Sequence, residues 1–457
     1  MIKAISMSVC GRLAAMLAPL LFIAAAPAAA EPGAPDRVTV IHAGHLLANP
    51  DQPPRANQTI IVRGGRVSEI RNGLIPAADI APHALYVDLS RSFVMPGLSD
   101  VHYHITEAEM SDRRSSNPIA RVSAIAFASA DQARHLLMAG ITSIRDVGDN
   151  SNAISFQLRD AIASGKIEGP RILAAGRLMS RSEGHGAEQR QSLAYLMPVA
   201  QGGCDGVESC RRVVRETIGD GSGADLIKFT GSGSSSEPWG RPDAVPTSFD
   251  DEVQTIVATA RQLGRRVAVH AHSPAAINQA LAAGAFTIEH GTYFDAESTK
   301  LFKARGAYMV PTSFIGELLL TDPRIRARNT PEDWNRIEIS AADQQKVAGK
   351  AWRAGIRIGV GTDSWVGADP RNTIREIEIF VADGIPAREA IAAATLNNAA
   401  ILGHAGDLGR IAPHYLADIV AMPGDPLADP AALRGIDFVM KDGAVVRFDA
   451  REGAARP

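Results

Sequence analysis

Short apolar runs recur along the middle of the chain and alternate with amphipathic segments. The segments 124–139 and 249–263 carry apolar residues at intervals of three and four, which is the spacing of one helix face. Strands that alternate with helices in this way predict a parallel sheet. The expected strands are 93–105, 141–147, 171–175, 225–230, 266–272, 286–290, 307–312 and 357–363.

Eight strand-then-helix units predict an α/β protein whose main domain, residues 94–404, is a (β/α)8 TIM barrel. Gly140, Gly284 and Gly355 follow helix-like segments, where glycine is the usual C-terminal cap. An open doubly wound sheet is the alternative. It would require a glycine-rich phosphate turn after the first strand, and the sequence there, PGLSD, is not one.

Both ends of the mature chain are rich in strand-like segments. Gly64-Gly65 and Asp442-Gly443 are turn signals of the kind that join two strands of a hairpin. Neither end is long enough to bury a core of its own. We therefore predict one small β-sandwich domain assembled from residues 31–93 and 405–457. The long connections 176–224 and 313–352 follow the third and seventh strands, where we expect loops that gate the substrate.

Residues 1–30 have the pattern of a secretory signal peptide. Lys3 and Arg12 precede the apolar run 13–26, and an Ala-Ala-Ala cleavage site follows. The alternative is an uncleaved anchor, but the run is shorter than the ~20 residues that span a bilayer. We expect a secreted or periplasmic protein with no membrane contact after cleavage. In that compartment Cys204 and Cys210 would form a disulfide, rather than a metal-binding pair.

The charge of the chain restricts its partners. Lys plus Arg is 47 and Asp plus Glu is 50, so nothing favours nucleic acid or an anionic membrane. A small-molecule substrate is the expected partner, and an assembly of identical chains is left open. Three cysteines are too few for a four-cysteine zinc site. The 12 histidines remain, and several stand in short patterned runs.

Histidines and other polar residues stand at the ends of five of the predicted strands. His102 and His104 end the first strand and point to the same side of it, because side chains alternate along a strand. Such positions form the active face of a barrel, and buried polar groups need partners there. Five strands with this feature are poorly explained by unrelated core histidines. The other residues are Lys228, His270, His272, His290 and Asp363.

Lys228 lies within an apolar strand. Burial beside metal ions would lower the pKa of its amine, and the neutral amine can add carbon dioxide to form a carbamate. A carbamate is an anionic ligand with two oxygens that can bridge two cations. The alternative is a lysine paired with a buried carboxylate.

The chain resembles the amidohydrolase superfamily, in particular the imidazolonepropionase-like enzymes and the Xaa-Pro or Xaa-Arg dipeptidases. The similarity covers almost the whole mature chain. It departs from the family pattern at Asn397-Asn398 and near His414, both away from the site. The motifs that carry it are VMPGLSDVHYH (94–104), ADLIK (224–228), VHAH (269–272), IEHG (288–291) and GTDS (361–364).

This resemblance implies a binuclear site with two divalent ions, zinc being the expected metal. His102, His104 and Asp363 would hold the more buried ion, and His270 and His290 the second. Lys228, as its carbamate with carbon dioxide, would bridge the two ions together with a hydroxide. His272 and His185 are expected to contact the substrate, although His185 could equally be an ordinary loop residue. The histidines at 42, 45, 83, 135, 404 and 414 are interpreted as residues without a role in the site.

The implied reaction is attack of the bridging hydroxide on an amide carbonyl, with Asp363 as the proton shuttle to the leaving nitrogen. A dipeptide or an N-acyl amino acid is the expected substrate, and Arg181, Arg190 and Arg241 are candidates to bind its carboxylate. A lactonase, an esterase or a hydrolase of amide-linked toxins would use the same centre. A non-catalytic ligand-binding barrel is the remote alternative, because all six ligand positions are filled.

Overall fold

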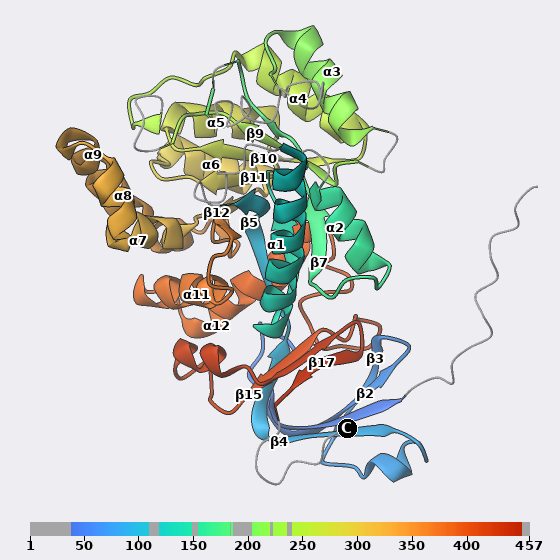
Figure 1. Ribbon diagram of the computed structural model, residues 1–457. Coiled ribbons are helices and arrows are strands. Elements are labelled where there is room, and N and C mark those ends of the chain that lie inside the picture. Colours follow the sequence, from blue (N-terminus) through green and yellow to red (C-terminus); the bar gives the residue numbers. More distant parts are fainter. Residues whose placement is uncertain are drawn as a thin grey trace, which may run out of the picture. The chain divides into compact units, whose positions relative to one another are not determined.

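Parallel strands in two sheets form the centre of the fold in the computed structural model (Figure 1). The model describes residues 38–108, 118–148, 154–182, 184–185, 203–219, 223–234 and 240–449. One sheet has the order β14-β5-β6-β7 and the other the order β13-β12-β11-β10-β9-β8. Their bounds are β5 (Leu98–Ala108), β6 (Ile141–Asp146), β7 (Arg171–Ala174), β8 (Leu178–Met179), β9 (Leu226–Thr230), β10 (Arg266–Ala271), β11 (Thr287–His290), β12 (Tyr308–Val310), β13 (Arg357–Ile358) and β14 (Ser364–Val366).

Backbone hydrogen bonds join the two sheets at both seams. The amide of Asp225 donates to the carbonyl of Ala174 at 2.9 Å, which links the end of β7 to the start of β9. At the other seam the amide of Val101 in β5 donates to the carbonyl of Val360 at 3.0 Å. The parallel strands therefore close on themselves, and the predicted (β/α)8 barrel is confirmed.

Helices follow the barrel strands, as the periodicity of the sequence predicts. At the end of α5, Gly284 adopts φ 102° and caps the helix, which a residue with a side chain would rarely do. The helices are α1 (Pro118–Met138), α2 (Ile154–Ala163), α3 (Val207–Ile218), α4 (Asp250–Gln262), α5 (Pro274–Ala283), α6 (Ala296–Arg305), α10 (Val347–Arg353), α11 (Asn372–Ala382), α12 (Ala387–Ala392) and α13 (Asn398–Leu402).

Strands from both ends of the chain form one mixed sheet of seven strands, in the order β17-β16-β15-β4-β1-β2-β3. Arg66 in β3 forms an isolated bridge with Leu416, which precedes β15, so the sheet curls and brings β3 toward the C-terminal strands. Apolar side chains from both halves, such as Ile60 and Phe438, share one core. The predicted β domain is thus confirmed. Its strands are β1 (Thr39–Leu46), β2 (Arg55–Arg63), β3 (Arg66–Asn72), β4 (Leu85–Pro96), β15 (Ile419–Met422), β16 (Phe438–Lys441) and β17 (Ala444–Phe448).

The first predicted barrel strand, 93–105, is two strands. Residues up to Pro96 belong to β4 in the terminal sheet, and β5 of the barrel begins at Leu98. Gly97 between them packs against Thr142, and a Cβ at this position would lie 2.5 Å from the Thr142 hydroxyl oxygen. The chain passes from one sheet to the other here, which apolar character alone could not indicate.

The two long connections differ from the loops that we expected. Residues after β12 form three helices, α7 (Ser313–Thr321), α8 (Pro323–Arg328) and α9 (Pro331–Gln344), before α10. The connection after β7 holds β8 and α3, and Cys204 and Cys210 form the predicted disulfide. Residues 186–202 of this connection, like the predicted signal peptide, lie outside the described residues.

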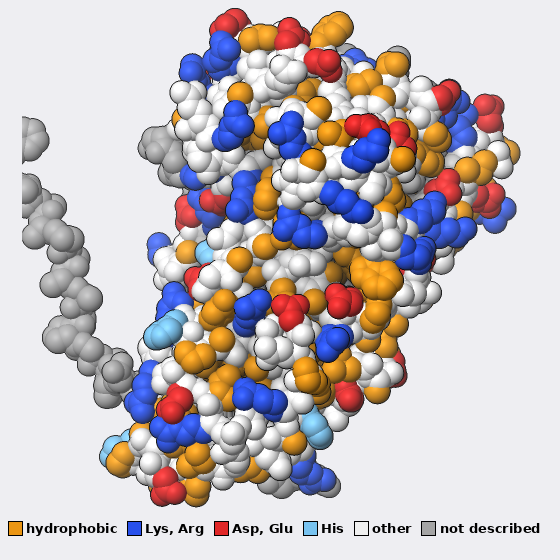
Figure 2. Space-filling view, turned by 180° about the vertical axis from the view of Figure 1, so that it is seen from behind, with side chains coloured by type: hydrophobic (Ala, Val, Ile, Leu, Met, Phe, Trp, Pro, Cys, Tyr) orange, Lys and Arg blue, Asp and Glu red, His pale blue; other side chains and the backbone are white. Residues whose placement is uncertain are grey.

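Charged side chains of both signs are intermingled on the face shown in Figure 2, in keeping with the net charge of −3. Within the described ranges, no helix combines the length and the apolar character that a bilayer-spanning segment needs.

Arg171 at the start of β7 connects the barrel to the terminal sheet. Its guanidinium lies 3.0 Å from Asp418 and 2.5 Å from Asp442, both in the C-terminal segment. It also donates to the hydroxyl of Ser143 at 2.9 Å. Asp418 is buried and in turn accepts the amide of Asp442. The Arg171–Asp418 pair is thus largely shielded from water, whereas the Asp442 side chain is exposed.

We expect Arg171→Ala to lower the free energy of unfolding by about 2–3 kcal/mol, because it leaves the buried Asp418 carboxylate without its cation. Urea denaturation would measure this loss. Arg134→Ala is the matched control, since its pair with Glu168 is exposed and should contribute less than about 0.5 kcal/mol. Equal losses in the two variants would contradict a stabilising role for this junction.

Candidate metal centre

Parallel strands bring the predicted site residues to one end of the barrel. His102 and His104 lie in β5, Lys228 in β9 and His270 in β10. His290 ends β11, His272 follows β10 by one residue, and Asp363 stands immediately before β14. All barrel strands run in the same direction, so their carboxyl ends share one face, where barrel active sites are found.

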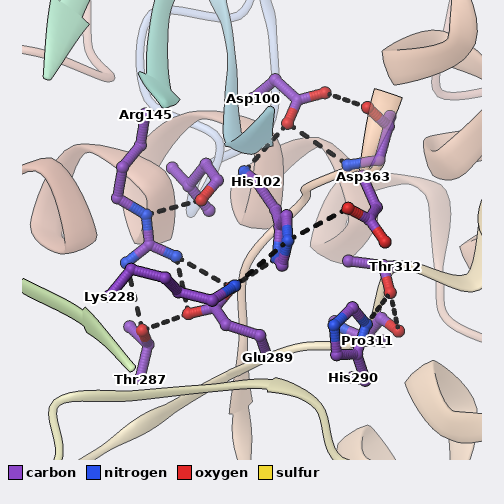
Figure 3. A network of polar contacts seen from close by, with 12 residues as sticks. Asp100, His102, Arg145, Lys228, Thr287, Glu289, His290, Pro311, Thr312 and Asp363 are labelled. Carbon is purple, nitrogen blue, oxygen red and sulfur yellow. Dashed lines mark hydrogen bonds and ion pairs between the residues drawn. The ribbon is translucent and has the colours of Figure 1, made fainter. Parts of the chain in front are cut away.

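Asp363 joins both histidines of β5. Its Oδ1 lies 2.9 Å from His104 Nε2 and 3.3 Å from His102 Nε2. Lys228 reaches the same point from the opposite side, with Nζ 3.4 Å from His102 Nε2 (Figure 3). Because His102 and Lys228 are both buried, their polar atoms need partners within the protein or from a bound ligand.

Three further histidines complete the cluster. His270, His272 and His290 offer ring nitrogens within 4.8 Å of one another, and His290 also forms such a group with His102 and Asp363. The rings of His272 and His290 are stacked, with centroids 4.8 Å apart and planes 7° apart. His290 therefore belongs to both groups and connects them.

The second nitrogen of several histidines is held by the protein. His102 Nδ1 lies 2.8 Å from Glu289, His290 Nδ1 lies 2.7 Å from Thr312 Oγ1, and His272 Nδ1 lies 2.7 Å from Thr292 Oγ1. Metal-binding histidines usually have such a partner, which fixes the ring and directs the other nitrogen to the ion. Imidazole nitrogens and one carboxylate form a donor set that suits a divalent transition metal. These residues fit a metal centre.

Burial keeps His270 and His290 in their neutral, ligand form. It lowers the pKa of His270 and His290 well below the usual value, and neighbouring cationic groups lower it further. Burial would raise the pKa of Asp363, but His102 and His104 outweigh it and hold this pKa well below the usual range. Burial also lowers the pKa of Lys228 to about 8. A neutral amine is therefore accessible at Lys228 near physiological pH.

Glu289 and Arg145 carry a function that the sequence did not reveal. Glu289 is fully buried and lies 2.8 Å from both His102 Nδ1 and the guanidinium of Arg145. Burial alone would raise the pKa of Glu289, but Arg145 and His102 hold it at about 2. The carboxylate thus stays charged and can accept a hydrogen bond from His102 Nδ1. The motif IEHG contains Glu289, but only the fold shows that the side chain points to His102.

Asp100 is a second residue whose role needed the structure. It is fully buried and accepts the amide of His102 at 3.0 Å and that of Thr362 at 3.2 Å. Its other oxygen accepts the hydroxyls of Thr362 and Thr373. Asp100 therefore ties the backbone of β5 to the segment that carries Asp363 (Figure 3). The sequence contained one indication of this role, because Asp100 stands two residues before His102 in the motif VMPGLSDVHYH.

The backbone is strained at three residues close to the cluster. His290, Thr312 and Asp363 adopt φ of 70°, 51° and 60°, values that residues other than glycine rarely take. Each such residue costs about 1–3 kcal/mol, and the surrounding contacts must hold it in place. Strain at three neighbouring positions is typical of a functional site.

The residues predicted to contact the substrate differ in their distance from the cluster. His185 stacks on His270 with ring centroids 4.7 Å apart, and His272 lies within the cluster itself, so both are beside the predicted metal ligands. The ligand choice of His270 over His272 stays a prediction. Arg241 pairs with Asp243 on the surface, Arg181 donates to the carbonyl of Ser182, and Arg190 lies outside the described residues.

The remaining described histidines lie elsewhere. His42 bonds Tyr86 and the carbonyl of Ile75 in the terminal sheet, and His404 pairs with Asp407. His135 pairs with Asp131 on the exposed side of α1. These local contacts agree with their interpretation as residues without a role in the site.

Known proteins share this architecture. The structure of a Xaa-Pro dipeptidase with bound methionine superposes with a TM-score of 0.80 at 31% identity, covering 90% of this chain and all of that chain. A prolidase complexed with N-methylphosphonate-L-proline gives a TM-score of 0.78 at 27% identity, covering 90% of this chain and all of that chain.

The sequence comparisons agree with the structural ones. Ochratoxinase of Aspergillus niger is 30% identical over 415 residues, which cover 86% of this chain and 82% of that protein. Residues 93–446 match the model of the amidohydrolase family. This match spans the whole barrel and β15 and β16 of the terminal sheet. The chain therefore belongs to the amidohydrolase family.

Proposed function

We propose that this protein hydrolyses an amide bond in a small substrate, such as a dipeptide or an N-acyl amino acid, with two divalent metal ions, expected to be zinc. One observation carries the proposal. Donor atoms from separate strands converge in two groups, His102–His290–Asp363 and His270–His272–His290, in which every histidine is buried and Asp363 is partly exposed. Unrelated core histidines would not be expected to converge in this way.

His102, His104 and Asp363 would hold one ion, and His270 and His290 the other. Lys228, as a carbamate, would lie between them. When bound, such ions lower the pKa of a water molecule and polarise the carbonyl of the substrate. The site has few anionic groups, so the carbamate would supply charge that the neutral histidines lack.

Asp363 is suited to move the proton. Its low pKa means that it begins the reaction as a carboxylate and can accept a proton. Within the described residues its side-chain contacts with His102 and His104 both use Oδ1, which leaves Oδ2 to carry the proton. Delivery of that proton to the amide nitrogen would turn a poor leaving group into a good one.

The comparisons support the substrate class. A Xaa-Pro dipeptidase and a prolidase are among the similar structures, and both names indicate peptide substrates. The relative ochratoxinase favours a second candidate, hydrolysis of a toxin at the same centre. A secreted or periplasmic location rests on the predicted signal peptide. A screen of dipeptides, N-acyl amino acids, ochratoxin and lactones would separate these substrates.

We expect Asp363→Asn to keep bound metal, because the amide oxygen can still act as a ligand, but to lose about 10²–10⁴-fold in kcat. Metal analysis and turnover on the best substrate of the screen would measure both. Asp369→Asn, in the segment after β14 and paired with Arg371, is the control and should stay near wild-type activity. Near-normal turnover of a fully metallated Asp363→Asn protein would refute the shuttle.

A carbamate at Lys228 makes metal binding depend on carbon dioxide. We expect metal-depleted protein to regain two zinc ions per chain with bicarbonate present and fewer without it. Lys228→Met replaces the lysine by an unbranched apolar side chain of similar length that cannot form a carbamate. The metal content of this variant should therefore be lower and independent of bicarbonate. Equal metal content in wild type with and without bicarbonate would contradict the carbamate.

Glu289→Gln should weaken metal binding about 10–100-fold. The substitution removes the carboxylate that accepts a hydrogen bond from His102 and pairs with Arg145. Titration against buffered zinc would measure this change. Glu297→Gln, on the exposed first turn of α6, is the control. Should Glu289→Gln bind zinc as tightly as this control, Glu289 would have no part in orienting His102.

A further inference from the structure

Gln344, the last residue of α9, joins the partners of two site histidines. Its Oε1 accepts the hydroxyl of Thr292, and Thr292 is the partner of His272 Nδ1. Its Nε2 donates to the carbonyl of Pro311 and lies 3.2 Å from Thr312 Oγ1, and Thr312 is the partner of His290 Nδ1. All of these side chains are buried. Figure 3 shows the part of this network formed by Pro311, Thr312 and His290.

The carbonyl of Pro311 fixes the donor and the acceptor in each hydrogen bond of the chain from Gln344 through Thr292 to His272. A carbonyl can only accept, so the Gln344 amide must turn its NH₂ group toward Pro311. Its oxygen then faces Thr292, whose single hydroxyl hydrogen must be donated to it. The Thr292 oxygen can therefore only accept from His272, and the 2.7 Å contact requires a proton on His272 Nδ1.

We propose that Gln344 is a positioning residue that holds His272 as the Nδ1–H tautomer, with its lone pair on Nε2. The ring then offers an acceptor or a metal ligand to the cluster and does not donate a hydrogen bond to the substrate. A substrate group beside His272 would therefore be an N–H or O–H donor. The link to metal affinity rests on the proposed function, whereas the tautomer does not.

The same amide supports the strained end of β12. Thr312 adopts φ 51°, and its hydroxyl lies 2.8 Å from the Pro311 carbonyl and 2.7 Å from His290 Nδ1. Glu376 holds the next turn by accepting the amides of Ser313 and Phe314. Gln344 thus connects the helices α7–α9, which follow β12, to the stacked rings of His272 and His290.

Nitrogen-15 NMR of full-length protein with labelled histidines would test the tautomer directly, in metal-free and zinc-loaded forms. Long-range correlations should show His272 protonated at Nδ1. Thr292→Ser keeps the hydroxyl and should keep this tautomer. Thr292→Val has nearly the same shape but no hydroxyl, so His272 should lose its preference for Nδ1–H. An Nε2–H tautomer in wild type, or no difference between the Ser and Val variants, would overturn the proposal.

Metal affinity provides a second readout. Gln344→Leu should weaken zinc binding about 10–100-fold in competition with a chelator, because both threonines lose a partner. Gln345→Leu, on the next residue, is the matched control and should bind zinc like wild type. Unchanged affinity in a folded Gln344→Leu protein would contradict the positioning role. If that variant does not fold, the two Thr292 variants still decide the question, and failure of the substrate screen would affect only the proposed function.

Discussion

Glu289 brings a full negative charge into the interior of the barrel, where an unpaired carboxylate would cost several kcal/mol. Arg145 compensates this charge through contacts of 2.8 and 3.0 Å. The guanidinium also donates to the carbonyl of Val101 in β5 and to Thr287 in β11. One cation from β6 therefore holds two other strands in place. The carboxylate that it stabilises orients His102, so the position of this proposed metal ligand depends on the Arg145–Glu289 ion pair.

A rigid support of this kind explains how the strained residues persist. His290, at the end of β11, and Asp363, just before β14, have positive φ, a conformation that the backbone would leave if nothing held it. Thr312 secures the ring of His290, while the amide of Asp363 donates to the carbonyl of His102 at 2.8 Å. Free energy gained in the core offsets this strain. The site is thus arranged before any ligand binds, as catalysis by fixed groups requires.

Much of this arrangement could be predicted from periodicity. Alternation along a strand placed His102 and His104 on one side, and the common direction of parallel strands placed His270, His290 and Asp363 on the same face. Arg145 and Gln344 could not be found in this way. Arg145 belongs to a strand without histidine or lysine, and Gln344 reaches the site from the end of a helix where we expected a loop. Their roles arise from contacts between segments far apart in sequence, and local patterns do not encode these.

Charge explains why Lys228 belongs in this centre. Arg145 already balances Glu289, so an additional ammonium group at Lys228 would be a buried cation next to neutral histidines. Burial lowers the pKa of Lys228 to about 8 for this reason, although the charges of Glu289 and Asp363 oppose the shift. The two divalent ions that we propose would, on the other hand, need more negative charge than Asp363 supplies. Conversion of the amine to a carbamate would remove the unfavourable cation and add the missing anion at a single position, whereas a glutamate there would impose a permanent negative charge on the buried site.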